Sequence, residues 1–144
     1  MREILFRGKR KDNGEWVKGN LFIPNKHEIP TQILIGTDIY RMQYDIIPET
    51  VGQYTGLTDK NGKKIFEGDI VSISGELKGT YTCVWEEYNF EYEFDNKTMS
   101  FGLACVDSDD IEVIGNIHDN PELIGDDDNG RVYQQRNAAS EVES

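Results

Sequence analysis

The stretch VGQYTGLTDKNGKKIFEGDIV, residues 51–71, carries the strongest structural signal in the 144-residue chain. At its centre, Asp59-Lys60-Asn61-Gly62 predicts a tight hairpin turn, because Asn and Gly tolerate the positive φ that such turns require. Further on, Glu67-Gly68-Asp69 precedes the apolar pair Ile70-Val71, which is typical of a turn that enters a strand. The stretch therefore predicts β-structure joined by tight turns.

Alternating apolar and polar residues predict strands on both sides of this stretch. The clearest alternation is at residues 90–94, where three aromatic residues alternate with two glutamates. We interpret these aromatics as core packing, and we expect Trp85 to be buried in the preceding strand. The predicted strands are residues 2–7, 15–23, 38–45, 70–74, 80–86, 90–94, 101–106 and 111–117.

The composition supports a mainly β protein. Leu, Ile, Val and Phe account for 36 of the 144 residues, enough for a hydrophobic core, whereas only three alanines occur. β-branched and aromatic residues favour strands, and no segment has the apolar spacing of an amphipathic helix. Short strands separated by glycine favour a small barrel or rolled sheet.

Charge is distributed unevenly along the chain. Residues 1–55 have a net charge of +1, residues 56–118 of −8 and residues 119–144 of −5. An acidic surface repels nucleic acid and anionic membranes, so only the N-terminal third could attract either. The first seven residues already include charge, and no later run suits a signal peptide or membrane span. We therefore expect a cytoplasmic protein that does not bind membranes.

One basic cluster stands beside an aromatic residue, and it comprises Arg7, Lys9, Arg10, Lys11 and Trp16. Such a cluster can bind phosphate groups through its cations while the aromatic ring stacks on a base. The alternative is a solvated hairpin loop above a buried tryptophan. These five residues are the candidate binding site, and they provide the only predicted route to nucleic acid.

Carboxylates supply the other candidate chemistry. Glu67, Asp69 and Asp109 could form a dispersed acid/base site, although Glu67-Gly68-Asp69 fits a turn better. The acidic runs 107–110 and 126–130 contain oxygen ligands but lack the spacing of a calcium loop, so we interpret them as solvated loops.

Neither a metal site nor a cofactor site is predicted. The two cysteines and the two histidines occur singly along the chain, without the close spacing that metal ligation needs. Cys83 and Cys105 are expected to stay reduced in the cytoplasm. No phosphate-binding glycine loop or nucleophile motif is present in the sequence.

The C-terminal region changes character after residue 124. Asn120-Pro121 predicts the start of a short helix, with Asn120 as its cap. Residues 125–144 are polar and acidic with few apolar side chains, so we predict a disordered tail.

Three parts of the chain resemble one known family in the same order. Residues 51–71 resemble the signature of the YopX family, whose members are encoded by phages and prophages of Gram-positive bacteria. Phe6-Arg7-Gly8-Lys9 with Gly14-Glu15-Trp16-Val17, and residues 114–123, agree with it on either side. The resemblance implies an SH3-like C-terminal β-roll of unknown function and supplies no catalytic residues.

Together these observations predict an N-terminal β subdomain at residues 1–50, packed on an SH3-like roll at residues 51–124, with a tail at residues 125–144. We expect a non-enzymatic phage or prophage accessory protein that binds a host or phage macromolecule and forms a homo-oligomer. Two alternatives stay open. The acidic body could mimic nucleic acid and bind a basic host protein, or dispersed carboxylates could form an enzyme site.

Overall fold

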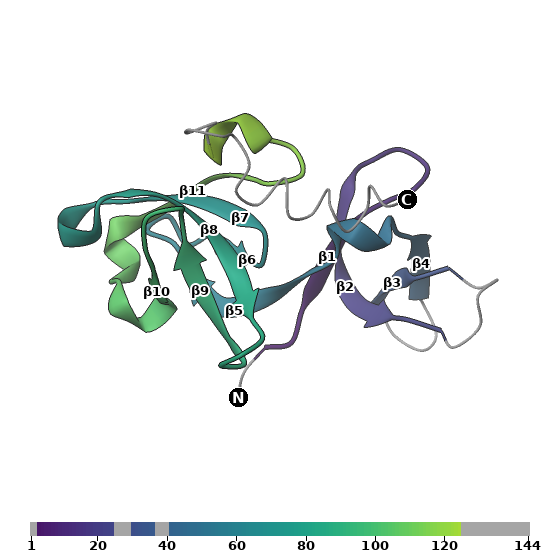
Figure 1. The fold of residues 1–144 in the computed structure, drawn as a ribbon. Coiled ribbons are helices and arrows are strands. Elements are labelled where there is room, and N and C mark those ends of the chain that lie inside the picture. The colour runs from purple at the N-terminus through teal and green to yellow at the C-terminus, as the bar shows by residue number, and fades with distance from the viewer. Residues whose placement is uncertain (1–2, 25–29, 37–40, 125–144) are drawn as a thin grey trace. The chain divides into compact units, whose positions relative to one another are not determined.

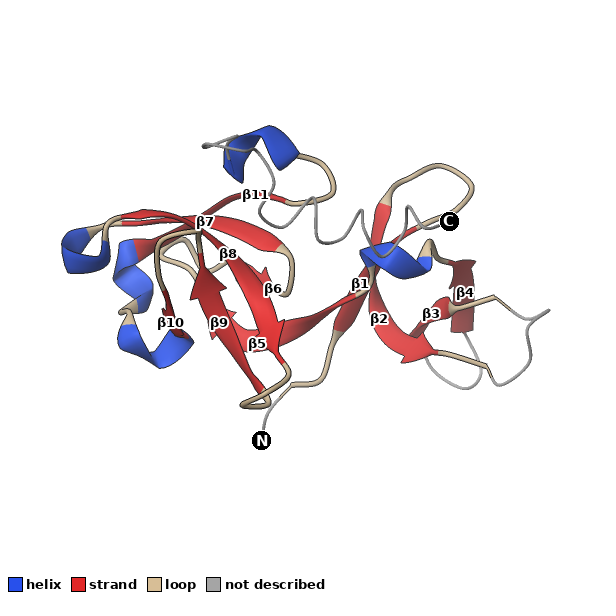
Figure 2. Ribbon diagram, viewed as in Figure 1, coloured by secondary structure: helices blue, strands red, loops and turns tan. Residues whose placement is uncertain are grey.

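The computed structural model describes residues 3–24, 30–36 and 41–124, and these residues divide between two compact units, Met1–Gly56 and Leu57–Ser144. Figure 1 shows the elements along the chain, and Figure 2 shows that strands dominate over helices. The protein is mainly β, as the composition predicts. The predicted tail at residues 125–144 lies outside the described residues.

The first unit is an antiparallel sheet with the strand order β4-β3-β2-β1-β5. Strand β5 runs across Gly56 into the second unit, and the sheet order continues from it to β6. The elements are β1 (Phe6–Lys9), β2 (Trp16–Phe22), β3 (Gln32–Gly36), β4 (Arg41–Asp45), the 3₁₀ helix η1 (Pro48–Thr50) and β5 (Gly52–Thr58).

The core of the first unit depends on a close approach to Gly8 in β1. Ile33 and Ile46 are fully buried. A Cβ atom added to Gly8 would lie only 2.5 Å from Ile46 Cγ2, so a larger residue would displace the isoleucine. One face of the β1–β2 hairpin is therefore closed by apolar packing, and the opposite face is left for polar side chains.

The second unit contains a five-stranded antiparallel sheet with the order β10-β9-β8-β7-β11. Its core includes Val71, Tyr81, Cys83, Phe94 and Ile111, all buried. The elements are β6 (Lys64–Phe66), β7 (Asp69–Ile73), η2 (Gly75–Leu77), β8 (Gly79–Glu86), β9 (Glu91–Asp95), β10 (Ser100–Gly102), η3 (Leu103–Cys105), η4 (Ser108–Asp110), β11 (Ile111–Asn116) and η5 (Pro121–Ile124).

This sheet is not closed into the barrel that the strand pattern suggests. Its outer strands are β10 and β11, and the strand predicted at 101–106 ends at Gly102. The chain turns there into η3, which buries Leu103 against the core. Strand β10 is consequently only three residues long, too short to close a sheet.

The predicted strands are found in the structure with shifted ends, but three strands were missed. The strand predicted at 38–45 is seen as β4, with residues 37–40 outside the described part. The missed strands β3, β5 and β6 are short or contain glycine and lack a long alternation. At the C-terminal end, the expected helix is a single 3₁₀ turn, η5.

The prediction that Trp85 is buried is wrong. Trp85 is 40% exposed, whereas Tyr81 and Cys83, which share its face of β8, are buried. Strand β8 extends beyond the core, and there Trp85 packs edge-to-face on Tyr92 with ring centroids 4.9 Å apart. The interpretation of the aromatic stripe as core holds for Phe94 and fails for Phe90, which is 77% exposed.

Within the described residues, no helix combines the length and the apolar character needed to cross a membrane.

Candidate binding face on the N-terminal hairpin

The β1–β2 hairpin gathers three cationic side chains around one tryptophan. Its register pairs Lys9 with Trp16 and Arg7 with Lys18. Because successive side chains of a strand point to opposite faces, these four residues share one face of the hairpin. We call Arg7, Lys9, Trp16 and Lys18 the cation face.

Two cation–π contacts lie within the cation face. Arg7 Cζ lies 4.7 Å from the centroid of the Trp16 ring, and Lys9 Nζ lies 5.7 Å from it. Arg7 is buried, Lys9 and Trp16 are half-buried, and Lys18 is exposed. The ring quadrupole attracts both cations, so the tryptophan holds positive charge near the surface.

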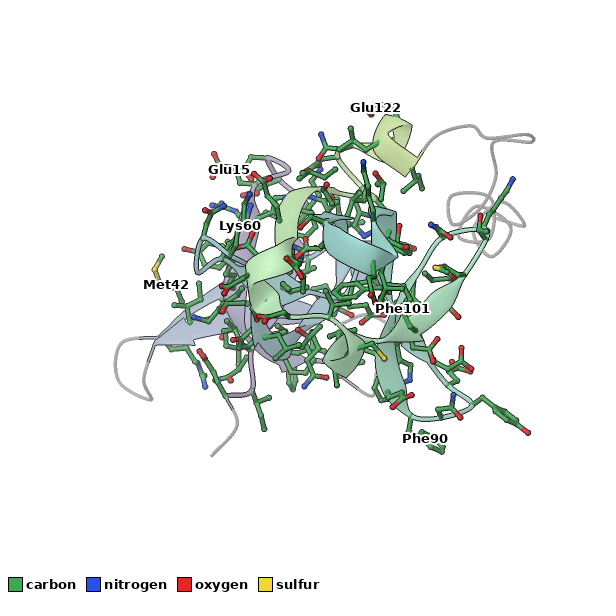
Figure 3. All side chains as sticks on the ribbon, turned by 90° about the vertical axis from the view of Figure 1, so that its left-hand side faces the viewer. Glu15, Met42, Lys60, Phe90, Phe101 and Glu122 are labelled. Carbon is green, nitrogen blue, oxygen red and sulfur yellow. The ribbon has the colours of Figure 1, made fainter. Side chains whose placement is uncertain are left out.

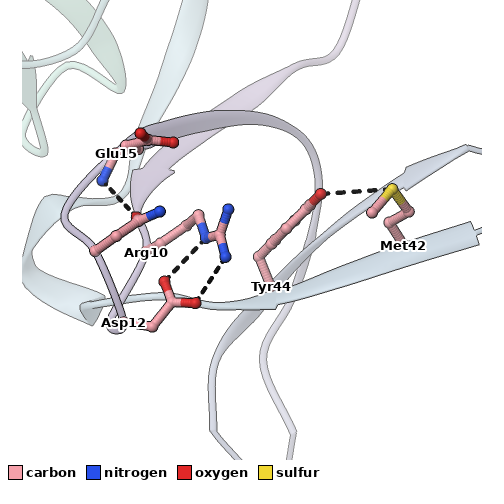
Figure 4. Close-up of polar contacts among 6 residues, drawn as sticks. Arg10, Asp12, Glu15, Met42 and Tyr44 are labelled. Carbon is pink, nitrogen blue, oxygen red and sulfur yellow. Dashed lines mark hydrogen bonds and ion pairs between the residues drawn. The ribbon is translucent and has the colours of Figure 1, made fainter.

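Arg10 follows Lys9 by one position and so points to the side opposite the cation face; its contact with Asp12 is drawn in Figure 4. Its guanidinium donates two hydrogen bonds to the Asp12 carboxylate, at 3.0 and 2.6 Å, and lies 4.6 Å from the centroid of the Tyr44 ring. The hydrogen bond from Arg10 lowers the pKa of Asp12 and raises the pKa of Arg10. Most of the charge of Arg10 is therefore balanced locally.

Lys11 lies in the turn at residues 11–13, between β1 and β2. It is exposed, and its backbone N–H donates to the Asp45 carbonyl at 2.9 Å. The turn is closed by the Asn13 side chain, whose Oδ1 accepts the Glu15 N–H at 2.9 Å. Of the five residues singled out from the sequence, the structure thus brings Arg7, Lys9 and Trp16 together and places Arg10 and Lys11 beyond them.

Two residues of this region were missed by the sequence reasoning. Lys18 follows Trp16 by two positions, so the period of two along a strand was a sufficient signal for its place on the same face. Tyr44 had no local signal, because its contact with Arg10 depends on how β4 is placed by β3.

In the second unit, the carboxylate of Asp59 has a structural role. It is 4% exposed, and its Oδ1 accepts the backbone N–H groups of Asn61 and Lys63, both at 2.9 Å. Its Oδ2 accepts the N–H of Val113 at 2.9 Å. Burial by itself raises the pKa of Asp59, but these three donors outweigh it and hold the pKa below its ordinary value.

Two of the dispersed carboxylates, Asp69 and Asp109, lie near opposite ends of the β7–β11 pair. Asp69 is 2% exposed, and its Oδ2 accepts the Phe66 N–H at 2.7 Å, which fixes the turn before β7. The β7–β11 register places Asp69 opposite Asn116, whereas Asp109 precedes Ile111 at the other end of the same ladder. Four residue steps along β7 separate these ends by about 13 Å.

The acidic run at residues 107–110 also forms local structure. Asp107 caps η4 by accepting the Asp109 N–H, and Asp110 accepts a hydrogen bond from Ser74 at 3.3 Å. The run at residues 126–130 lies outside the described residues, as does His27.

Both cysteines are free thiols, Cys83 buried and Cys105 exposed. In the part of the chain that the structure describes, no three His, Cys, Asp or Glu side chains are grouped to hold a metal ion.

Known proteins resemble this chain over most of its length. A family model described as YopX protein matches residues 5–125. The crystal structure of protein EF1440 from Enterococcus faecalis is similar, with 22% identity and a TM-score of 0.55 over 86% of this chain and 99% of that chain. At this level of identity the likeness shows the fold alone. No curated protein matches the chain.

Proposed function

The chain belongs to the YopX protein family, and from that premise we propose that it is a phage or prophage accessory protein of the bacterial cytoplasm that acts as a non-enzymatic, homo-oligomeric binding module. Its binding surface is the cation face, and the ligand of that face is an acidic protein surface. The observation that carries the proposal is the placement of Arg7 and Lys9 on the Trp16 ring, 4.7 and 5.7 Å from its centroid.

Charge supports an acidic ligand. Residues 1–56 carry eight basic and seven acidic side chains, whereas residues 57–144 carry seven basic and twenty acidic ones. Three cations of the first unit lie on one face beside an aromatic ring, and aromatic residues and arginine are enriched at protein interfaces. A second copy of the chain is itself an abundant acidic ligand for this face.

An SH3-like description of the second unit is part of the proposal. Strands β7 to β10 form a meander, and β11 returns to pair with β7 after the 3₁₀ turns η3 and η4. This strand order supports an SH3-like description, although a shared fold alone does not assign a function. The carboxylates of Asp59 and Asp69 accept backbone hydrogen bonds within this unit, which favours a structural use of its buried acids over a catalytic one.

Sedimentation equilibrium of the full chain tests the proposal. We expect an oligomer at tens of micromolar in 0.05 M salt that weakens towards 0.5 M, since the screening length falls from about 10 Å at 0.1 M to about 3 Å at 1 M. The double variant K9E/K18E should dissociate it, whereas K63E/K78E, which changes the net charge equally on exposed lysines of the second unit, should not.

Two outcomes contradict the proposal. If the wild type is a monomer at low salt, the chain is not a homo-oligomer. If K9E/K18E leaves the oligomer unchanged, the chains associate through a surface other than the cation face. Fluorescence anisotropy with a labelled single-stranded oligonucleotide separates the ligand classes: tight binding abolished by K9E/K18E would make nucleic acid the ligand of the cation face.

A further inference from the structure

The outer end of the β8–β9 hairpin exposes aromatic side chains. Tyr88 is 87% exposed, Phe90 is 77% exposed and Trp85 is 40% exposed. Figure 3 shows Phe90 at the end of the hairpin, directed away from the strands. Single exposed apolar residues are common, but three aromatics within six positions of one hairpin form a patch of the kind that marks an interaction site.

The backbone at this end is strained by the identity of Phe90. Its φ is +56°, the one positive value among the described non-glycine residues. Bulky residues rarely occupy this left-handed region, which glycine and asparagine enter at low cost. Because Phe90 packs little of its ring against the chain, its presence at a position suited to glycine brings the fold no compensating burial.

The same end concentrates negative charge. Glu86 and Glu91 face each other directly in the β8–β9 register, an arrangement that is unfavourable in an antiparallel pair. Glu86 accepts the Tyr88 N–H at 3.1 Å, whereas Glu87 and Glu91 are exposed. Residues 79–96 contain no lysine or arginine. We call Trp85, Glu87, Tyr88, Phe90 and Glu91 the acidic tip.

Exposed aromatics, a strained backbone and opposed like charges all weaken this hairpin in the isolated chain. Unfavourable local features of this kind are found mostly at functional sites, where binding of a partner compensates for them. A partner of the acidic tip must offer positive charge for the glutamates and a surface for the aromatic rings.

We propose that the acidic tip of one copy docks on the cation face of a second copy. This inference rests on the proposed function, because it identifies the acidic surface that the cation face binds. The charges are complementary: Lys9 and Lys18 meet Glu87 and Glu91, and Trp16 provides an aromatic surface for Phe90 and Tyr88.

This contact joins two different surfaces, so every copy carries one donor and one acceptor. Such heterologous contacts close into rings or continue as filaments. Assembly can close as a reciprocal dimer, in which each tip docks on the cation face of the other copy, or proceed to larger rings and filaments.

Charge-swap complementation tests the docking. E87K/E91K and K9E/K18E should each be monomeric at concentrations where the wild type assembles, with dissociation constants raised at least tenfold. An equimolar mixture of the two variants should recover assembly in 0.05 M salt, because the wild-type tip of one variant meets the wild-type face of the other. E76K/E122K, a reversal of two exposed glutamates outside the tip, is the matched control and should assemble like the wild type.

A second variant separates docking from folding. Phe90→Gly removes the exposed ring and relieves the backbone, so its melting temperature should equal or exceed that of the wild type while its dissociation constant rises at least tenfold. Phe90→Trp, which keeps an aromatic ring, should retain assembly.

The outcomes distinguish the two proposals. If K9E/K18E is monomeric while E87K/E91K and Phe90→Gly assemble normally, the docking is overturned and the proposed function stands. If E87K/E91K dissociates but the mixture does not recover, the tip binds a surface other than the cation face and the docking is again overturned. A monomeric wild type overturns both.

Discussion

Two turns of the second unit, residues 59–63 and residues 87–90, differ in how well their residues suit the backbone conformation. In the first, Gly62 takes a φ of +83° and the Asp59 carboxylate accepts three backbone N–H groups. In the second, Phe90 takes a φ of +56° and two glutamates oppose each other beside it. The residues of the first turn suit its backbone conformation and those of the second do not, as expected if the first turn serves stability and the second serves the docking proposed above.

The largest expected effect compares a core side chain of the β8–β9 hairpin with one close to the second turn. Phe94 is fully buried in β9, so Phe94→Ala should lower the free energy of unfolding by about 3–5 kcal/mol. Trp85 lies nearer the turn and is 40% exposed, so Trp85→Ala should lower the free energy of unfolding by only about 1 kcal/mol. Urea denaturation measures both, and equal losses would show that the tip is part of the core.

The next effect concerns the Asp59 turn. Asp59→Ala leaves three backbone donors without their acceptor, so unfolding free energy should fall by about 3 kcal/mol. Asp59→Asn keeps one acceptor oxygen and should lose less. Thermal and urea unfolding of the two variants would contradict the structural role of Asp59 if both behaved like the wild type.

A reciprocal exchange at the two left-handed positions compares the turns directly. Gly62→Ala should destabilise the chain by about 1–2 kcal/mol, because a side chain is strained at this φ. Phe90→Gly should stabilise it by about 0.5–1 kcal/mol, since relief of the strain exceeds the added freedom of the unfolded chain. Calorimetry of both variants should show changes in stability of opposite sign. If both variants are less stable than the wild type, Phe90 does not strain the backbone.

The smallest effect is the dependence of stability on pH. The pKa of Asp59 is lowered in the folded chain, so the carboxylate stabilises the fold fully above its unfolded pKa of about 3.9. This contribution is lost as the pH falls through the lower, folded pKa. Unfolding followed between pH 5 and pH 2 should show a decline in the wild type that is reduced in Asp59→Asn. Parallel curves would assign the acid sensitivity to other groups.

Much of the fold was readable from the sequence because the signals are local. Alternation of apolar and polar residues located β8, β9 and β11, and the turn residues Asn61 and Gly62 located the hairpin between β5 and β6. The basic residues of β1 and Trp16 of β2 were likewise recognised as one cluster. Each of these depends on residues within a few positions of one another.

Only the tertiary structure decided which of these residues act together. The β1–β2 register brought Trp16 and Lys18 to the face of Arg7 and Lys9, and the β3–β4 pairing brought Tyr44 to Arg10. The length of β8 beyond the core exposed Trp85, although its alternation matched that of the buried Cys83. The alternation of apolar and polar residues predicts to which face of a strand each side chain points. How far the core reaches along a strand depends on segments distant in the chain, so burial and the composition of each binding surface are set by the packing of the whole unit.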